Sequence, residues 1–520
     1  MTVKRLFISS AGIGSRVAGL SAVPNKCMLP INYKAIISRI LNKFDPSIVT
    51  VIAIGHYGNL VREFIKIAHP KRKFIFVKID KYTGQGSGPG YTLNKCKKYL
   101  QCPFIYTACD TLTLENPKFE KYNWVGVSKT KLTERFLIFE KKSKHSGYSF
   151  FNKKRCFEIS KTKKSFEAFI GLANIYDYQL FWKGFKANNQ LIDNELQFSN
   201  GLHFLSNKIK LKSFRWLDTG TNESYIKTVD FFKDKTQRKP DEVVYITNKR
   251  VVKFFIDKNK CIKLKRRSAK LKKFVPKIIK SSDNFLTYQY IEGKHLTETN
   301  KKIFVKFLKK LKSKFWIRLK VDNKIFKEKC KKFYKDKTYE RVSLAIRQNP
   351  NIDNIGIING KKIPSIYKLL SKVDWKSLYN GYPTNFHGDL QPENIIVTRK
   401  GDFKFIDWRT DFSGLEYGDI YYEFSKLNHM LTVNTKKVTE GKIKVQYKNN
   451  NEIKYSFEKR KLLISFQKIL YKFIKDNNFD LNKVKILTSL IYLNISKFYE
   501  YPYSEMLFYH GKYQLYLLTE

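Results

Sequence analysis

Acidic residues are scarce in this chain of 520 residues: 45 Asp and Glu stand against 101 Lys and Arg, giving a formal net charge of +56. Such a charge is typical of proteins that bind nucleic acid or an acidic membrane surface. The lysines, however, are spread over the whole length and form no basic arm. They accompany abundant Ile, Asn, Phe and Tyr, which an A+T-rich genome favours. We therefore expect that the basic composition reflects drift in the genome and that the protein has no specific nucleic-acid partner. The positive electrostatic field of the protein still favours phosphorylated substrates.

Cysteine motifs and long apolar runs are also missing. The seven cysteines contain no CxxC pair and are odd in number, which argues against a zinc site and a disulfide framework and favours reduced thiols. No apolar run approaches the ~20 residues that span a bilayer. The first ten residues lack the apolar core and cleavage site of a signal peptide. We expect a cytoplasmic protein without a membrane span.

The length and apolar content predict more than one domain. Apolar residues make up 42% of the chain, enough for well-filled interiors, and 520 residues exceed one compact core. The polar stretch around Pro240 is typical of a linker. We predict an N-terminal domain over 1–232, a linker over 233–242 and a C-terminal domain over 243–520.

Strand-like and helix-like stretches alternate through the first domain. Strands are predicted at 3–9, 49–54, 73–79 and 104–107, and helices at 35–44, at 59–68 and just before residue 100. This alternation predicts an α/β fold with a doubly wound, mostly parallel sheet. Such sheets bind ligands beyond the carboxyl ends of their strands, which is where Gly12 and Asp110 fall.

The first strand runs into the glycine-containing segment SSAGIGSR at 9–16. Gly12 and Gly14 permit a tight turn whose backbone N–H groups can approach phosphates. Arg16 and, ten residues later, Lys26 supply cations that can stabilise a triphosphate as pyrophosphate leaves. Gln85 and Gly90 lie in a second flexible loop, GQGSGPG, that can read a base edge.

Two aspartates complete the N-terminal set. Asp110 follows a buried strand and Asp218 lies in WLDTGT. Two carboxylates brought together at strand ends can hold Mg²⁺ between a triphosphate and an acceptor phosphate.

This set resembles the sugar-1-phosphate nucleotidyltransferases, particularly the glucose-1-phosphate thymidylyltransferase type, over about residues 3–230. The family has a G-x-G-[ST]-R loop, a later Lys-x-x-x-P element, a base-reading Gln before a Gly, and two metal-binding aspartates. The resemblance implies catalytic Arg16 and Lys26, metal-binding Asp110 and Asp218, and nucleotide-binding Ala11, Gly12, Gly14, Ser15, Gln85 and Gly90. The family's Glu-Lys-Pro segment has no clear copy here, so Lys161 or Lys163, with Gly171, is the proposed acceptor site. Cys109 replaces the usual Gly before the first metal aspartate.

The C-terminal domain carries HGDLQPEN at 387–394 and IDW at 406–408. Phosphoryl transfer needs a carboxylate to orient and deprotonate the attacking hydroxyl, and oxygen ligands for Mg²⁺. Asp389 fits the first role, and Asn394 and Asp407 fit the second. A small sheet followed by Lys-rich helices from about residue 297 predicts an α+β, bilobal, protein-kinase-like domain.

These motifs resemble the aminoglycoside phosphotransferase/choline kinase superfamily over about residues 243–510. The resemblance implies that Lys253 contacts the phosphates, that Gln289 and Ile291 lie in a hinge that meets adenine, and that Asp419 is a structural brace. Two features depart from the family pattern: the helix after Lys253 offers no Glu to pair with it, and the preceding loop has no glycine.

Together the motifs predict a bifunctional enzyme that uses ATP, a second NTP and Mg²⁺. One domain phosphorylates a small metabolite, most simply a sugar at its anomeric hydroxyl; the other makes an NDP-sugar for surface glycans. An amino alcohol such as choline, giving a CDP-linked product, is the alternative within enzymes. The two reactions are either consecutive or parallel, and the chain either acts alone or forms a homo-oligomer. A basic nucleic-acid-binding protein is the alternative from another class.

Overall fold

The fold was analysed in a computed structural model, which describes residues 3–17, 19, 23–130, 137–141, 148–151, 166–192, 194–234, 236 and 239–520. The chain forms two compact units. Unit 1 comprises residues 1–258 and 280–288, and unit 2 comprises residues 259–279 and 289–520. In the described part of the chain, no helix is long and apolar enough to cross a membrane.

Unit 1 is built on a nine-stranded sheet with a parallel centre. Four parallel neighbours run in the order β6, β1, β4, β5, with bounds Phe104–Ala108, Arg5–Ser10, Val49–Ile54 and Phe74–Lys78. Strand β11 (Phe166–Ile175) lies antiparallel to β6 and leads to the remaining strands. These are β8 (Asn123–Thr130), β9 (Ile138–Lys141), β10 (Tyr148–Phe151) and β12 (Ile209–Ser213). The prediction of an α/β domain with a mostly parallel sheet is confirmed in this centre.

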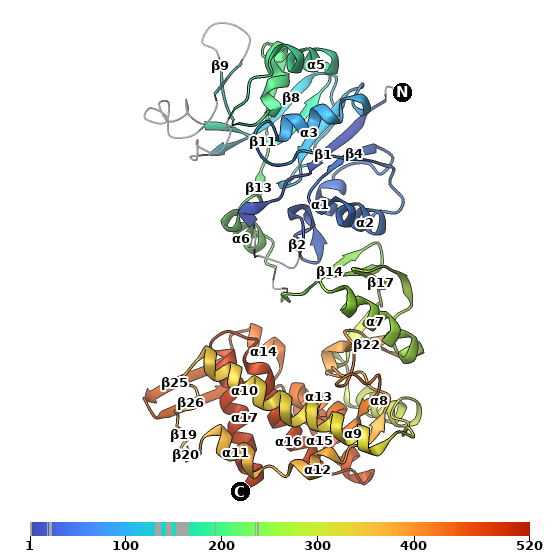
Figure 1. The fold of residues 1–520 in the computed structure, drawn as a ribbon, viewed down its shortest axis with the longest axis vertical. Helices are drawn as coiled ribbons and strands as arrows, with labels where there is room; N and C mark the ends of the chain where they lie inside the picture. The colour runs from blue at the N-terminus through green and yellow to red at the C-terminus, as the bar shows by residue number, and fades with distance from the viewer. Residues whose placement is uncertain are drawn as a thin grey trace. The chain divides into compact units, whose positions relative to one another are not determined.

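Helices cover both faces of the sheet (Figure 1). The strands are buried on both sides, so alternate residues of β1 enter different cores: Leu6 and Ile8 enter one, and Phe7 the other. The first core is closed by α1 (Ile36–Leu41) and α2 (Gly58–Ala68). The second is closed by α3 (Pro89–Lys95), α5 (Tyr178–Ala187) and the 3-10 helix Phe198–Leu205.

A polar edge forms where the order of the parallel strands reverses. Strand β1 has β4 on one side and the later strand β6 on the other, so the crevice beyond β1 and β6 is a topological switch point. Next to it, β7 (Thr111–Thr113) pairs with β13 (Trp216–Asp218) in an antiparallel ribbon. Helix α6 (Asn222–Phe231) follows, with Thr221 as its N-cap. The hairpin β2 (Pro30–Ile31) and β3 (Lys34–Ala35) is bound to α6, since Tyr225 Oη donates to Pro30 O at 2.6 Å.

A small sheet packs against the rest of unit 1. Its order is β14 (Glu242–Thr247), β15 (Arg250–Phe255), β17 (Phe285–Gln289), β16 (Ile278–Ser281). Tyr245, Val252, Phe254 and Phe285 enter the core that α1 and α2 close, and Tyr245 Oη donates to Met28 O at 2.7 Å. The small sheet predicted ahead of the Lys-rich helices is therefore present, and it opens with the hairpin β14–β15. By its packing it belongs to unit 1, whereas the boundary at 232–243 assigned it to the second domain. That boundary stays a prediction.

Unit 2 combines helices with three short sheets. Its helices are α7 (Lys258–Leu271), α8 (Lys301–Lys314), α9 (Asn323–Lys331), the π-helix Lys332–Asp336, α10 (Lys337–Gln348), α11 (Ile366–Lys372), α12 (Trp375–Tyr379), α13 (Ile420–Thr432), α14 (Thr435–Thr439), α15 (Lys461–Asp476), α16 (Leu481–Ser496) and α17 (Tyr503–Thr519). The sheets are β18 (Gly293–His295) with β22 (Ile395–Thr398) and β23 (Phe403–Phe405); β21 (Pro383–Thr384) with β24 (Gly418–Asp419); and β19 (Ile357–Ile358) and β20 (Lys361–Lys362) with β25 (Ile443–Asn449) and β26 (Glu452–Phe457).

The core of unit 2 lies among α9 to α13, α16 and α17. The segment 385–394 contains the HGDLQPEN motif and is called the catalytic loop below, after its predicted role; it runs between β21 and β22 and is held beside α13. The Lys-rich helices predicted from about residue 297 are present, but the hairpin β25–β26 was not predicted, although Ile443, Val445, Ile453 and Tyr455 enter the core. A bilobal kinase-like arrangement of this part of the chain stays a prediction.

Candidate active sites

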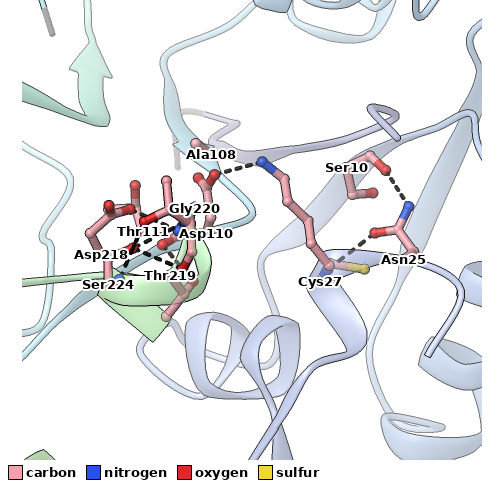
Figure 2. A network of polar contacts seen from close by, with 12 residues as sticks. Ser10, Asn25, Cys27, Ala108, Asp110, Thr111, Asp218, Thr219, Gly220 and Ser224 are labelled. Carbon is pink, nitrogen blue, oxygen red and sulfur yellow. Dashed lines mark hydrogen bonds and ion pairs between the residues drawn. The ribbon is translucent and has the colours of Figure 1, made fainter. Parts of the chain in front are cut away.

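The glycine turn of unit 1 is tied to the loop that carries Lys26. Gly14 has a φ of 73°, a conformation that favours glycine, and a Cβ there would lie 3.2 Å from the Lys26 side chain. Asn25 is 2% exposed and holds this loop to β1: its Nδ2 donates to Ser10 O at 3.2 Å, and its Oδ1 accepts from Cys27 N at 3.1 Å (Figure 2). The sequence analysis did not single out Asn25, because no spacing rule marks it.

Lys26 and Asp110 form an ion pair at the carboxyl end of β6. Lys26 Nζ lies 2.6 Å from Asp110 Oδ2. Burial disfavours both charges, but the mutual attraction and hydrogen bond prevail: the pKa of Lys26 is raised and the pKa of Asp110 is lowered. Both side chains are therefore charged at neutral pH.

Asp218 is brought to Asp110 by the β7–β13 ribbon, in which Asp218 is paired with Thr111. Gly220 separates the two carboxylates: a Cβ on it would lie 3.1 Å from both Asp110 Oδ2 and Asp218 Oδ1. Thr219 fastens the turn, since its Oγ1 donates to Asp110 O at 2.8 Å (Figure 2). The WLDTGT segment thus supplies one carboxylate, the tether and the small residue between the carboxylates.

These groups line a cavity of about 560 Å³. Of the predicted residues, the structure brings the following to its wall: Gly12, Gly14, Ser15, Arg16, Lys26, Asp110, Gly171 and Asp218. The wall also includes residues that the sequence analysis missed, among them Tyr82, Glu195, Gln197 and Trp216. Tyr82, Glu195 and Gln197 lie outside the predicted motifs, whereas Trp216 begins the WLDTGT segment but its type alone did not mark it as a wall residue.

Three predicted nucleotide-binding residues do not line the cavity. Ala11 is buried and its carbonyl accepts from His56 N at 2.9 Å. Gln85 is exposed, while Gly90 packs on the 196–197 backbone, where its N donates to Leu196 O at 2.7 Å. Lys161 and Lys163 lie outside the described residues. The roles of these residues stay predictions.

The two carboxylates fit a magnesium ion that is shared with a substrate. Within the described ranges, no three His, Cys, Asp or Glu side chains gather closely enough to hold a metal alone. Mg²⁺ is commonly held by one or two carboxylates together with substrate phosphates and water. Asp110 and Asp218 would hold it here, and when bound it would neutralise charge on a triphosphate.

In unit 2, the catalytic-loop motif forms a compact hydrogen-bonded turn. Asn394 Nδ2 donates to Asp389 O at 2.9 Å and to Asp389 Oδ2 at 3.1 Å. Glu423, fully buried on α13, accepts from His387 N and Gly388 N at 3.1 and 2.8 Å. Burial, only partly offset by these bonds, raises the pKa of Glu423 to about 7. Glu423 was also missed from sequence.

His387 is a structural member of this turn. Burial lowers its pKa to about 4, so the imidazole is neutral at pH 7. Its Nδ1 accepts from Asp389 N at 3.2 Å, which leaves the proton on Nε2 to bond Ile406 O at 3.0 Å. These bonds indicate that His387 shapes the loop that carries Asp389.

Lys426 of α13 contacts Asp389 directly, with 2.6 Å between Nζ and Oδ1. Burial opposes ionisation of Asp389, but Lys426 prevails and the pKa of Asp389 is lowered. Asp407 follows β23 with a φ of 58°, a strained value for a residue other than glycine. Such strain is concentrated at functional sites.

Lys253 has an acidic partner on the neighbouring strand. In β15 it is 5% exposed, and its Nζ lies 3.7 Å from Glu242 Oε1. This partner was not predicted, because the register between neighbouring strands cannot be read from residue spacing. In unit 2, Gln289 is exposed and its N donates to Lys277 O at 3.0 Å, and Ile291 is partly exposed.

Buried Asp419 braces β21 and α13 by accepting from Tyr382 N, Tyr421 N and Tyr334 Oη.

No protein-family model and no curated protein sequence matches the chain. Several solved structures are similar to about 45% of it. A UDP-glucose pyrophosphorylase complexed with UDP-glucose has 16% identity and a TM-score of 0.37, covering 45% of this chain and 99% of its own. A CTP:phosphocholine cytidylyltransferase from Streptococcus pneumoniae has 13% identity and a TM-score of 0.34, and the match covers 44% of this chain and 99% of that protein. A nucleoside-diphosphate-sugar pyrophosphorylase from Vibrio cholerae has 15% identity and a TM-score of 0.34, and the match covers 43% of this chain and 99% of that protein.

Proposed function

We propose that unit 1 is a cytoplasmic nucleotidyltransferase that joins a small-molecule phosphate, most simply a sugar 1-phosphate, to a nucleoside triphosphate. The observation that carries this proposal is the Lys26–Asp110 pair beside Asp218 on the wall of a 560 Å³ cavity. Cations and paired carboxylates at a strand-end crevice suit the binding of two phosphate-bearing substrates.

The proposed reaction is one displacement at phosphorus. An oxygen of the acceptor phosphate attacks the α-phosphorus of the NTP, the bond to the α–β bridging oxygen breaks, and pyrophosphate leaves with that bonding pair. Lys26 and Arg16 face the charge that develops on the phosphates, and a charged donor held in place before the reaction needs no reorganisation. The glycine turn offers backbone N–H groups to the triphosphate. No covalent enzyme intermediate is required.

We further propose that the chain phosphorylates the precursor of that acceptor with ATP. Asp389 accepts the proton of an attacking hydroxyl, whose oxygen bonds the γ-phosphorus as ADP leaves. The neutral His387, buried Glu423 and Asn394 support this role, because they fix the loop that carries Asp389. Asn394 and Asp407 would hold Mg²⁺, which would neutralise charge on the ATP phosphates. Lys253 as a phosphate ligand, and Gln289 and Ile291 as adenine contacts, belong to the same proposal.

Mass spectrometry of products separates the two activities. The full chain is incubated with Mg²⁺ and each NTP in turn, once with glucose 1-phosphate or phosphocholine, and once with ATP and the unphosphorylated compounds. Asp110→Asn should abolish nucleotide transfer while phosphorylation continues, and Asp389→Asn should abolish phosphorylation alone. The controls are Asp80→Asn and Asp402→Asn, since both aspartates are exposed and pair with surface lysines.

The product identities decide between the alternatives. A sugar product favours the NDP-sugar pathway, and a CDP-amino alcohol favours the choline-type alternative. Nucleotide transfer to a compound that the chain does not phosphorylate would leave two parallel reactions. Loss of nucleotide transfer in Asp80→Asn but not in Asp110→Asn would contradict the proposed site. Inactivity combined with tight, steeply salt-dependent RNA binding would favour the nucleic-acid alternative.

A further inference from the structure

The surroundings of Asp389 in unit 2 are strongly cationic. Lys426 contacts its carboxylate directly. The side chain of Arg409 passes the catalytic loop, because a Cβ on Gly388 would lie 2.7 Å from Arg409 Cδ. Lys337 Nζ and Arg409 Cζ lie 3.9 and 5.3 Å from the ring centre of one residue, Phe333. Two cations beyond Lys426 therefore gather at this loop.

Helix α10 adds a fourth cation. Arg341 follows Lys337 by one helical turn, a spacing at which like charges repel. Its guanidinium donates to Asn494 O at 3.2 Å. Burial lowers the pKa of Lys337 well below its usual value; Arg409, Arg341 and Lys426 lower it further and Asp389 opposes them, so a bound anion would favour the protonated lysine. The four cations thus act on one another through a poorly solvated space.

Few carboxylates offset these charges. In the described part of the chain, Lys337, Arg341 and Arg409 form no ion pair within 4.0 Å. Asp389 is already paired with Lys426, and Glu340, which acts on Arg341, is exposed. The nearby His429 is held neutral by burial, which lowers its pKa well below its usual value. The region therefore carries excess positive charge.

Compositional drift does not explain this arrangement. Drift adds lysines where they cost little, on exposed surfaces such as those of Lys331 and Lys332. Lys337 and Arg409 are partly buried against an aromatic ring, and burying unpaired charge costs free energy that a bound anion would return. Lys337 also follows directly on the π-helix 332–336, and π-helical turns occur frequently at functional sites.

We propose that the hydroxylated acceptor of unit 2 carries an anionic oxygen group, a carboxylate or a phosphate monoester, and that Lys337, Arg341 and Arg409 bind that group. The inference rests on the proposed kinase function and narrows its substrate class. A quaternary ammonium acceptor would need carboxylates or free aromatic faces. Here Lys337 Nζ already lies over Phe333 and 5.9 Å from the ring centre of Tyr422.

Matched acceptors test the inference on the full chain with Mg²⁺ and ATP, by release of ADP. Glucose, glucuronate and glucose 6-phosphate share one skeleton, and choline represents cationic acceptors. We expect glucuronate or glucose 6-phosphate to be preferred, and whichever is preferred identifies the anionic group. Lys337→Met should raise the KM for that acceptor about tenfold or more, as expected for loss of a charge-assisted bond, without raising the KM for ATP. Lys337→Arg should retain most of the affinity, and Lys332→Met is the matched control.

Preference for choline or glucose over both anionic compounds would overturn the inference. So would a Lys337→Met variant in which only the KM for ATP rises, because the cations would then serve the nucleotide. If no acceptor is phosphorylated, the kinase proposal fails for these compounds. Thermal unfolding then tests, independently of activity, whether Lys337, Arg341 and Arg409 bind an anion. Inorganic phosphate replacing chloride at constant ionic strength should raise the Tm of the wild type and Lys332→Met more than that of Lys337→Met. Equal shifts in all three would remove the anion site.

Discussion

Lys26 and Asp110 are 84 residues apart in sequence, yet Lys26 Nζ lies 2.6 Å from Asp110 Oδ2. This bond joins the loop that follows the glycine turn to the end of β6. Because each partner holds the other in its charged form, the pair persists over a wide pH range. It weakens only when acid protonates Asp110, below the usual range near pH 4, or when base deprotonates Lys26, above the usual range near pH 10.

Replacing Lys26 by Met should lower the rate of nucleotide transfer by about 10²–10³, the usual effect of removing one preorganised charged donor. Pyrophosphate release at saturating NTP measures this effect. Lys34→Met is the control, because Lys34 is exposed on β3. A Lys26→Met variant with normal turnover would show that the pair is only structural.

Replacing Lys426 by Met should shift the pH dependence of phosphorylation. Without Lys426, the largest influence that offsets burial is lost and the pKa of Asp389 rises, so the base is protonated over more of the acidic range. The acidic limb of kcat/KM should therefore move to higher pH, measured by ADP release between pH 4 and about 9. Lys485→Met, on the neighbouring helix α16, is a suitable control. An unchanged acidic limb with reduced kcat would argue that Lys426 acts on the phosphates instead.

Two glycines of unit 1 should differ sharply when changed to alanine. A Cβ at Gly90 would lie 2.5 Å from Gln197 O and 2.7 Å from Leu196 O, and backbone atoms cannot move away cheaply. Gly90→Ala should therefore lower the free energy of unfolding by about 1–3 kcal/mol, the usual cost of overpacking. Gly12→Ala should leave stability nearly unchanged, since nothing lies within 4 Å of a Cβ there. Urea denaturation of both variants checks this, and equal losses would contradict the packing described.

Tyr245→Phe tests the docking of the small sheet. The change removes the donor to Met28 O but keeps the ring, whose centre lies 4.6 Å from that of Phe64. We expect a loss of about 1 kcal/mol in the unfolding free energy of unit 1, measured by hydrogen exchange of the backbone amides of its central strands. Tyr33→Phe is the control because its side chain is 40% exposed. If only the unfolding free energy of unit 2 falls, β14 and β15 do not contribute to unit 1 as their contacts indicate.

The sequence predicted well the elements that follow from periodicity. The buried strand at 49–54 matches β4 residue for residue, and most others differ by one or two positions, as element ends commonly do. The WLDTGT motif identified Asp218 from the sequence, whereas the tether formed by its neighbour Thr219 was found only in the structure.

Contacts between distant segments could not be predicted. Asn25 anchors its loop to β1, Glu423 orders the catalytic loop 35 residues away, and Glu242 meets Lys253 through strand register. In each case the residue type is common, and only the folded chain gives it a partner. Lys337 could not be predicted either, because nothing in the sequence distinguishes it from the many other lysines until its burial is known.

The division of the chain has a topological consequence. Because unit 1 takes residues 1–258 and 280–288 while unit 2 takes 259–279 and 289–520, the backbone passes between them three times. No single scission frees either one whole. A chain divided near Pro240 would carry β14, β15 and β17 on its C-terminal piece, and the apolar side chains that these strands cover in unit 1 would be exposed. Each unit is therefore assembled from two separate segments of one continuous polypeptide.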